Sequence, residues 1–152
     1  MTNNDIPPLL PPEDMPAIKT QSDLARHWRA LMGPLGFSRP VLWLMFLDPS
    51  GRCDGMVTQV DEIPETSDPE LLANLLGICA QVIDSELQPG SRVAFLRSLP
   101  GPRELTDGDR SWARGLLDAA REAGLPCEPV HLATDEAVRV IALDDLEERR
   151  SA

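Results

Sequence analysis

The chain has 152 residues, of which 42% are hydrophobic, so it can form one globular domain with a sizeable core and is not disordered throughout. Its net charge of −11, its lack of Tyr and its low aromatic content (4%) argue against nucleic-acid binding, which needs a basic face or a base-stacking platform. No apolar run reaches membrane-spanning length and no signal-peptide pattern opens the chain, so we expect a cytoplasmic protein without membrane contact.

The composition divides the chain into three parts. Residues 1–17 contain five prolines, which remove backbone donors and favour extended backbone, so this part is expected to be a flexible Pro-rich arm. Residues 18–143 carry the predicted helices and strands of a single domain, and residues 144–152 form a charged tail that is expected to fray.

The first elements of the domain are a helix and a hairpin. Thr20 and Asp23 form a capping-box pattern, which predicts a helix that ends near Gly33. His27 lies beside the apolar stripe of this helix and is expected at the surface. The run Val41–Leu47 is wholly apolar, which indicates a central strand buried on both faces, and residues 53–60 are expected to be its hairpin partner.

A second capping box is predicted at Ser67 to Glu70, with Pro69 in the first turn of a helix that stops before Pro89. A strand over residues 92–96 and a Pro/Gly loop follow.

Thr106 and Asp109 then cap a helix that Gly124 closes. Two strands, 130–133 and 138–143, end the domain. The order predicts an α/β fold with a mixed sheet flanked by helices in a three-layer arrangement.

The segment from Arg97 to Asp109 resembles the metal-site signature of RadC-like proteins, which belong to the JAB/MPN family of metal-dependent isopeptidases. In that family a strand runs into an HxHP loop, and an Asp at the start of the next helix completes the zinc site. Here Pro100 and Asp109 match that pattern, whereas the histidine positions hold Arg97 and Leu99. The runs 46–52 (FLDPSGR) and 109–125 (DRSWARGLLDAAREAGL) are similar to the family's hairpin and following helix.

The resemblance covers about residues 18–143 and implies the family's cytidine-deaminase-like topology. It also implies that the metal chemistry is lost. A hydrolytic zinc ion needs three protein ligands and an open position, and an arginine cation would repel a metal. The family's general-base Glu is expected at the entry to the first long strand, where residues 38–40 carry no carboxylate. We therefore expect no metal and no cofactor.

Asp109 has a simpler role available, because it stands three residues after Thr106 and suits a helix cap. A further hypothesis is that Arg97 faces Asp109 and forms an ion pair in the emptied metal pocket.

The sequence also offers two alternative candidate sites. Cys127 and His131 have the spacing of half a zinc site, but no CxxC or second His pair accompanies them, and the three widely spaced cysteines favour reduced thiols. A divergent hydrolase or a small-anion site could instead use new residues in the old pocket. The candidates for that role are Arg97, Arg103, Glu104, Asp107, Asp109 and His131.

The sequence favours a catalytically inactive RadC-like domain that acts as a protein-interaction or regulatory module, and it leaves enzymatic activity undecided. The expected partner is another protein or a second copy of the chain. Arg97, Leu99, Arg103 and Asp109 mark the old metal pocket, where an anion or a partner could bind.

Overall fold

The computed structural model of this chain describes residues 8–11, 14–102 and 104–142. The described chain forms three helices and five strands, in the predicted order of helix, two strands, helix, strand, helix and two strands. These elements are α1 (Gln21–Met32), β1 (Val41–Leu47), β2 (Cys53–Val60), α2 (Pro69–Glu86), β3 (Arg92–Ser98), α3 (Asp107–Glu122), β4 (His131–Ala133) and β5 (Val138–Val140).

The five strands form one mixed sheet in the order β2-β1-β3-β4-β5. Strand β1 is antiparallel to both β2 and β3, β3 is parallel to β4, and β4 is antiparallel to β5. The apolar run of β1 is therefore flanked by strands on both sides, as its continuous hydrophobicity predicts. The mixed α/β class expected from the sequence is confirmed.

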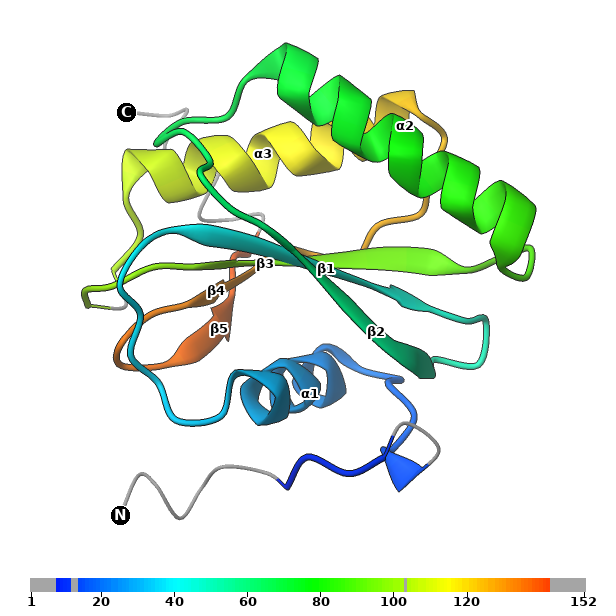
Figure 1. Cartoon of the computed structure of the whole chain (residues 1–152), viewed down its shortest axis with the longest axis horizontal. Coiled ribbons are helices and arrows are strands. Elements are labelled where there is room, and N and C mark those ends of the chain that lie inside the picture. Colours follow the sequence, from blue (N-terminus) through cyan, green and yellow to red (C-terminus); the bar gives the residue numbers. More distant parts are fainter. Residues whose placement is uncertain (1–7, 12–13, 103, 143–152) are drawn as a thin grey trace.

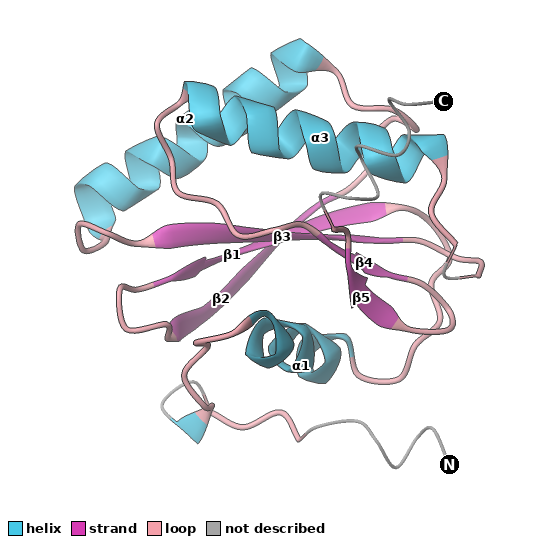
Figure 2. Cartoon of the chain, turned by 180° about the vertical axis from the view of Figure 1, so that it is seen from behind, coloured by secondary structure: helices cyan, strands magenta, loops and turns pink. Residues whose placement is uncertain are grey.

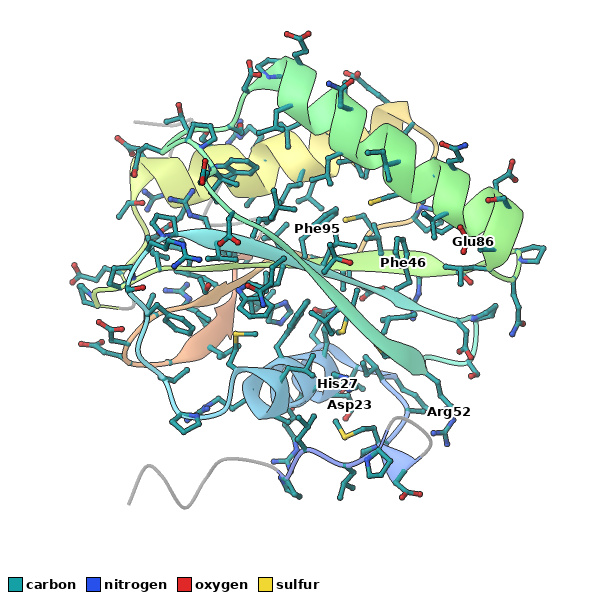
Figure 3. The ribbon with its side chains drawn as sticks, in the orientation of Figure 1. Asp23, His27, Phe46, Arg52, Glu86 and Phe95 are labelled. Carbon is teal, nitrogen blue, oxygen red and sulfur yellow. The ribbon has the colours of Figure 1, made fainter. Side chains whose placement is uncertain are left out.

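Helices cover both faces of the sheet. Helices α2 and α3 lie side by side over one face, and α1 lies against the other (Figures 1 and 2). Each interface has its own apolar cluster, because side chains alternate along a strand. Figure 3 shows Phe95 between the sheet and the α2/α3 layer, whereas His27 lies on α1 on the opposite side. Among the described residues, no helix combines the length and apolar character that crossing a membrane requires.

The helix caps agree with the sequence at two of three positions. Thr20 and Thr106 each complete a capping box, with Asp23 and Asp109 respectively. The box predicted at Ser67 is wrong, because Asp68 is the N-cap of α2 and its side chain accepts a hydrogen bond from the Leu71 amide at 3.2 Å. The physical reason is Pro69, which takes the first helical position and leaves the residue before it as the cap.

Ser67, which precedes the N-cap, forms hydrogen bonds that link the start of α2 to α3. Its amide donates to Ser111 Oγ at 3.1 Å, and its hydroxyl donates to the Ser111 carbonyl at 3.0 Å. The two helices also approach closely at Gly115, where a Cβ would lie 2.5 Å from Leu72 Cδ1. The absence of a side chain at that position is therefore part of the α2/α3 packing.

Strand β3 extends two residues beyond the predicted end at residue 96. Residues 96–98 pair with β4 in parallel register, and the Leu99 amide continues the contact by donating to the Ala133 carbonyl at 3.0 Å. The final strand β5 ends at Val140, whereas the sequence predicts a strand over 138–143. The predicted charged tail, residues 144–152, lies outside the described residues.

The described part of the predicted arm, residues 8–11 and 14–17, contacts the domain. Met15 is buried, and its carbonyl accepts a hydrogen bond from Arg52 Nη1 at 3.0 Å. The Ile18 amide, directly after the arm, donates to the Gly51 carbonyl at 2.7 Å. Residues 1–7, 12 and 13 lie outside the described residues, so flexibility of the arm stays a prediction.

We predict that Gly51→Ala destabilises the protein more than Gly101→Ala does. Both glycines have positive φ (90° and 115°), so each substitution carries a conformational cost of about 1–3 kcal/mol. Only Gly51 also faces a neighbour, because its Cβ would lie 2.2 Å from the Ile18 carbonyl oxygen, while Gly101 faces open space. Urea unfolding of the two variants measures the difference. Equal losses would contradict a close backbone contact at Gly51.

Candidate functional site

The end of β3 and the start of α3 bring Arg97 and Asp109 together. Along β3, Val93 and Phe95 point into the α2/α3 cluster, and Arg97 continues that alternation. Asp109 is fixed by its place in the first turn of α3. Its amide donates to Thr106 Oγ1 at 3.1 Å, and its Oδ2 accepts from the Thr106 amide at 2.9 Å.

The other carboxylate oxygen of Asp109 faces the guanidinium. Arg97 Nε lies 3.3 Å from Asp109 Oδ1, and the two side chains are 0% and 1% exposed. The capping role of Asp109 and its ion pair with Arg97, both expected from the sequence, are therefore confirmed together. One carboxylate performs both roles because each oxygen serves a different partner.

Two backbone carbonyls complete the surroundings of the guanidinium. Arg97 Nη1 donates to the Glu65 carbonyl at 3.2 Å and to the Gly108 carbonyl at 3.3 Å. Glu65 can come this close because Gly108 has no side chain, and a Cβ there would lie 2.6 Å from the Glu65 carbonyl oxygen. Among the described residues, Nε and Nη2 of Arg97 and Oδ1 of Asp109 make no hydrogen bond, so the pair interacts by charge.

Burial lowers the pKa of the Arg97 guanidinium from its ordinary value, and the negative charges of Asp109 and Glu65 oppose that shift. An arginine keeps its proton in a protein, so the group remains a cation. Sequence reasoning does not identify Glu65, because its contribution depends on a loop that the fold carries from β2 to α2.

The site does not fit the zinc ion of the signature that residues 97–109 resemble. A cation fills the space beside Asp109, at a position where the resemblance places a histidine. Among the described residues, no three or more His, Cys, Asp or Glu side chains gather into a group able to hold a metal ion.

Three other predicted pocket residues that the structure describes, Leu99, Glu104 and Asp107, do not share the deep burial of the pair. Leu99 is half-buried and packs against the α2/α3 cluster, while Glu104 is exposed. Asp107 is exposed and lies 3.8 Å from Arg110. Arg103 lies outside the described residues.

His131 lies on the other face of the sheet from Arg97. Its register partner on β3 is Leu96, which belongs to the apolar cluster against α1. Its Nδ1 lies 3.2 Å from the Pro129 carbonyl, and its Nε2 is buried without a hydrogen-bond partner among the described residues. The set of six residues proposed for a divergent enzyme is therefore not assembled in one pocket.

Cys127 packs against the α2/α3 cluster instead of joining His131. Burial raises the pKa of its thiol to about 12, aided by the charge of Glu128. The thiolate that a metal site needs is thus disfavoured.

The surface position expected for His27 is wrong, because this side chain is only 7% exposed. It stands three residues after Leu24 and four before Leu31, which places it on the buried side of the helix. That spacing is the signal that identifies it. Burial lowers the pKa of its imidazole.

A comparison of the chain with protein-family models and with curated proteins gave no significant match. The function must therefore be argued from the site itself.

We predict that Arg97→Met lowers the free energy of unfolding by about 3–5 kcal/mol, because it leaves the Asp109 carboxylate buried without its partner charge. The matched control is Arg39→Met. Arg39 pairs with Asp61 at 2.9 Å, but their side chains are 59% and 44% exposed. The control should lose at most about 1 kcal/mol. Urea unfolding monitored by tryptophan fluorescence measures both, and a loss at Arg97 no larger than the control's would contradict the contribution of the buried pair.

We predict a pH dependence of stability that belongs to His131. Burial lowers its pKa from 6.5 to about 4, so below pH 6.5 the unfolded chain binds a proton that the folded chain does not. Stability due to this group is present above pH 6.5 and is lost as the pH falls towards 4. Between about pH 7 and about pH 5 the wild type should lose roughly 2 kcal/mol more than His131→Leu. Parallel pH profiles for the two proteins would contradict a buried neutral imidazole.

Proposed function

We propose that this chain is a non-catalytic domain of the RadC-like JAB/MPN type that acts as a protein-interaction or regulatory module. The observation that carries the proposal is the buried pair of Arg97 and Asp109. It occupies the junction of strand and helix at which the resemblance places a zinc site.

The arrangement of elements supports the family assignment. A helix precedes a hairpin, and a second helix and strand lead to a third helix, as the family order requires. The strand order β2-β1-β3-β4-β5 with a helix layer on each face is compatible with a cytidine-deaminase-like topology. The end of β3 also delivers residue 97 to the first turn of α3, as a shared ligand site would need.

The absence of catalysis is supported by how the junction is filled. Hydrolysis needs a metal-bound or activated water beside an open substrate position. Here Arg97 and Asp109 are shielded from solvent, and Leu99 contributes packing instead of a ligand. The same burial counts against a small-anion site, because an incoming anion would have to reach a side chain with no exposed surface.

The surface of the protein supports a protein partner. The net charge of −11 disfavours polyanions as partners. Self-association through the free edge of β2 is the other form that such a module can take.

The test is the metal content of the purified, untagged protein after incubation with excess zinc and desalting. We predict substoichiometric zinc in the wild type, because Arg97 holds the ligand space. The variant Arg97→His/Leu99→His restores the family's histidines and should retain close to one zinc per chain. Inductively coupled plasma mass spectrometry measures both.

Asp109→Ala provides the control. Near-stoichiometric zinc in the wild type that disappears in Asp109→Ala would overturn the non-catalytic assignment. A double-histidine variant that folds and retains no zinc would instead contradict the inherited site geometry, and with it the family resemblance.

A further inference from the structure

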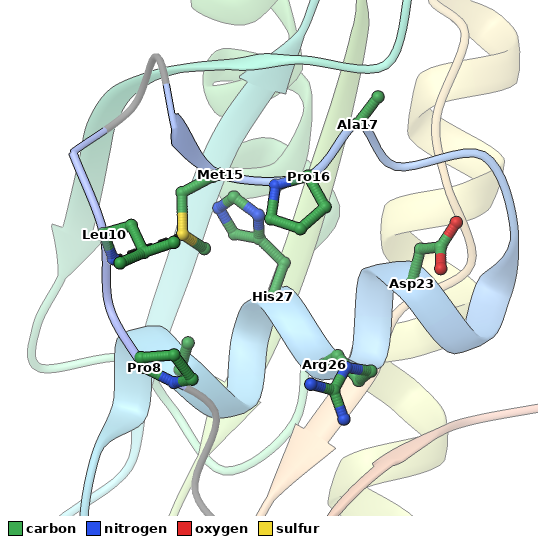
Figure 4. A pocket seen from close by; sticks show the side chains of 9 residues that line it. Pro8, Leu10, Met15, Pro16, Ala17, Asp23, Arg26 and His27 are labelled. Atoms are coloured by element: carbon green, nitrogen blue, oxygen red, sulfur yellow. Dashed lines mark hydrogen bonds between the residues drawn. The ribbon is translucent and has the colours of Figure 1, made fainter.

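Residues 8–11 and 14–17, called the strap below, lie across α1 at the sheet face opposite the Arg97–Asp109 pair (Figures 1 and 4). Beneath the strap is a surface made by α1 and β2, called the groove below. The groove residues are Asp23, Arg26, His27, Ala30 and Leu31 of α1 with Cys53 and Val57 of β2.

The strap is held as a bound peptide would be held. Its main-chain contact is the Met15 carbonyl, which accepts from Arg52 Nη1 at 3.0 Å, and the adjoining Ile18 amide donates to Gly51. Its one deeply buried side chain is Met15, at 8% exposure. Main-chain hydrogen bonds combined with one apolar anchor are a common mode of peptide recognition.

The strap fills the groove incompletely. Pockets of about 130 Å³ and about 180 Å³, both partly open to solvent, lie between the strap and the groove, and Leu10, Met15 and His27 line both of them. Leu9 lines the larger pocket, yet Leu9 and Leu10 remain 60% and 40% exposed, so the leucines of the strap are only partly covered.

His27 adds a polar group without a partner. Its ring is 7% exposed and points into the cavity between Met15 and Pro16 (Figure 4), yet no hydrogen bond joins it to a described residue. Its ring nitrogens are not among the fully buried atoms that lack a partner, because the pocket they face is partly open to solvent. Pro16 cannot bond to the imidazole in place of water, because a proline has no N–H to donate. A peptide with a different residue at that point can donate its amide to the imidazole.

We propose that the groove is a docking site for an extended apolar peptide segment of a partner protein, and that the strap occupies it in cis. This inference deepens the proposed interaction role and rests on it. A partner peptide suits the groove better than a second copy does, because two chains of net charge −11 repel each other. The strap then competes with the partner peptide and lowers the apparent affinity of the groove for it.

The test uses a fluorescein-labelled peptide with the sequence of residues 6–19, titrated into the full chain and followed by fluorescence anisotropy. The wild type should bind weakly, because its own strap occupies the groove at a high effective concentration. Met15→Asp removes the anchor and should increase the apparent affinity at least tenfold. Asp14→Asn is the matched control, because Asp14 is an exposed strap residue that lines neither pocket, and its affinity should stay at the wild-type value.

A second variant keeps the test valid if Met15→Asp folds poorly. Arg52→Met removes the hydrogen bond to the Met15 carbonyl without changing the groove, and it should also raise the affinity. In the Met15→Asp background, Val57→Lys should abolish binding, whereas Thr58→Lys on the same strand should not, because Val57 lines the cavity and Thr58 is exposed.

Three results would contradict the proposal that the groove is a docking site for a partner peptide. The first is equal binding of this peptide and of the same peptide carrying Met15→Asp. The second is an unchanged affinity in both strap-weakened variants. The third is dimerisation of Met15→Asp in sedimentation, which would assign the groove to a second copy. Zinc content distinguishes the two proposals, because zinc retained through Asp109 would contradict the proposed function while the peptide titration would be unaffected.

Discussion

The buried contact between Arg97 and Asp109 constrains three separate parts of the chain. Arg97 comes from the end of β3, Asp109 from the first turn of α3, and the carbonyl of Glu65 from the loop before α2. Moving two charges out of water is costly unless their partners are placed accurately. The position of α3 on the sheet is therefore linked to the cap of that helix, to the register of β3, and to a glycine at position 108 that admits the loop.

The same constraint places a cation and a carboxylate at one point of the fold. A strand end that faces a helix N-terminus gathers side chains from two elements, here the guanidinium of Arg97 and the carboxylate of Asp109. The carboxylate therefore caps its helix and pairs with the cation, and solvent has no access to either group.

Local signals in the sequence predict most of the fold, and in the site they predict the pair of Arg97 and Asp109 but not the contribution of Glu65. The apolar run of β1 and the caps at Thr20 and Thr106 involve residues close together in sequence, so pattern and capping rules find them. The shift of the N-cap of α2 from Ser67 to Asp68 depends on which helical position Pro69 takes. The burial of His131 and the approach of Glu65 depend on residues far apart in the chain, for which one sequence offers no signal.

The two faces of the sheet are covered unequally, and this asymmetry explains why the strap is needed. Helices α2 and α3 have 18 and 16 residues and together cover one face, whereas α1 has only 12 residues and covers the other face alone. At about 1.5 Å per residue, α1 is too short to shield five strands. Met15 of the strap and the adjoining Ile18 cover part of the sheet face that α1 leaves exposed. Few hydrogen bonds hold these residues to the domain. The strap shields apolar surface but is held by few contacts, so a peptide that fits the groove better can replace it. The α1 face is therefore where binding of a partner destabilises the fold least.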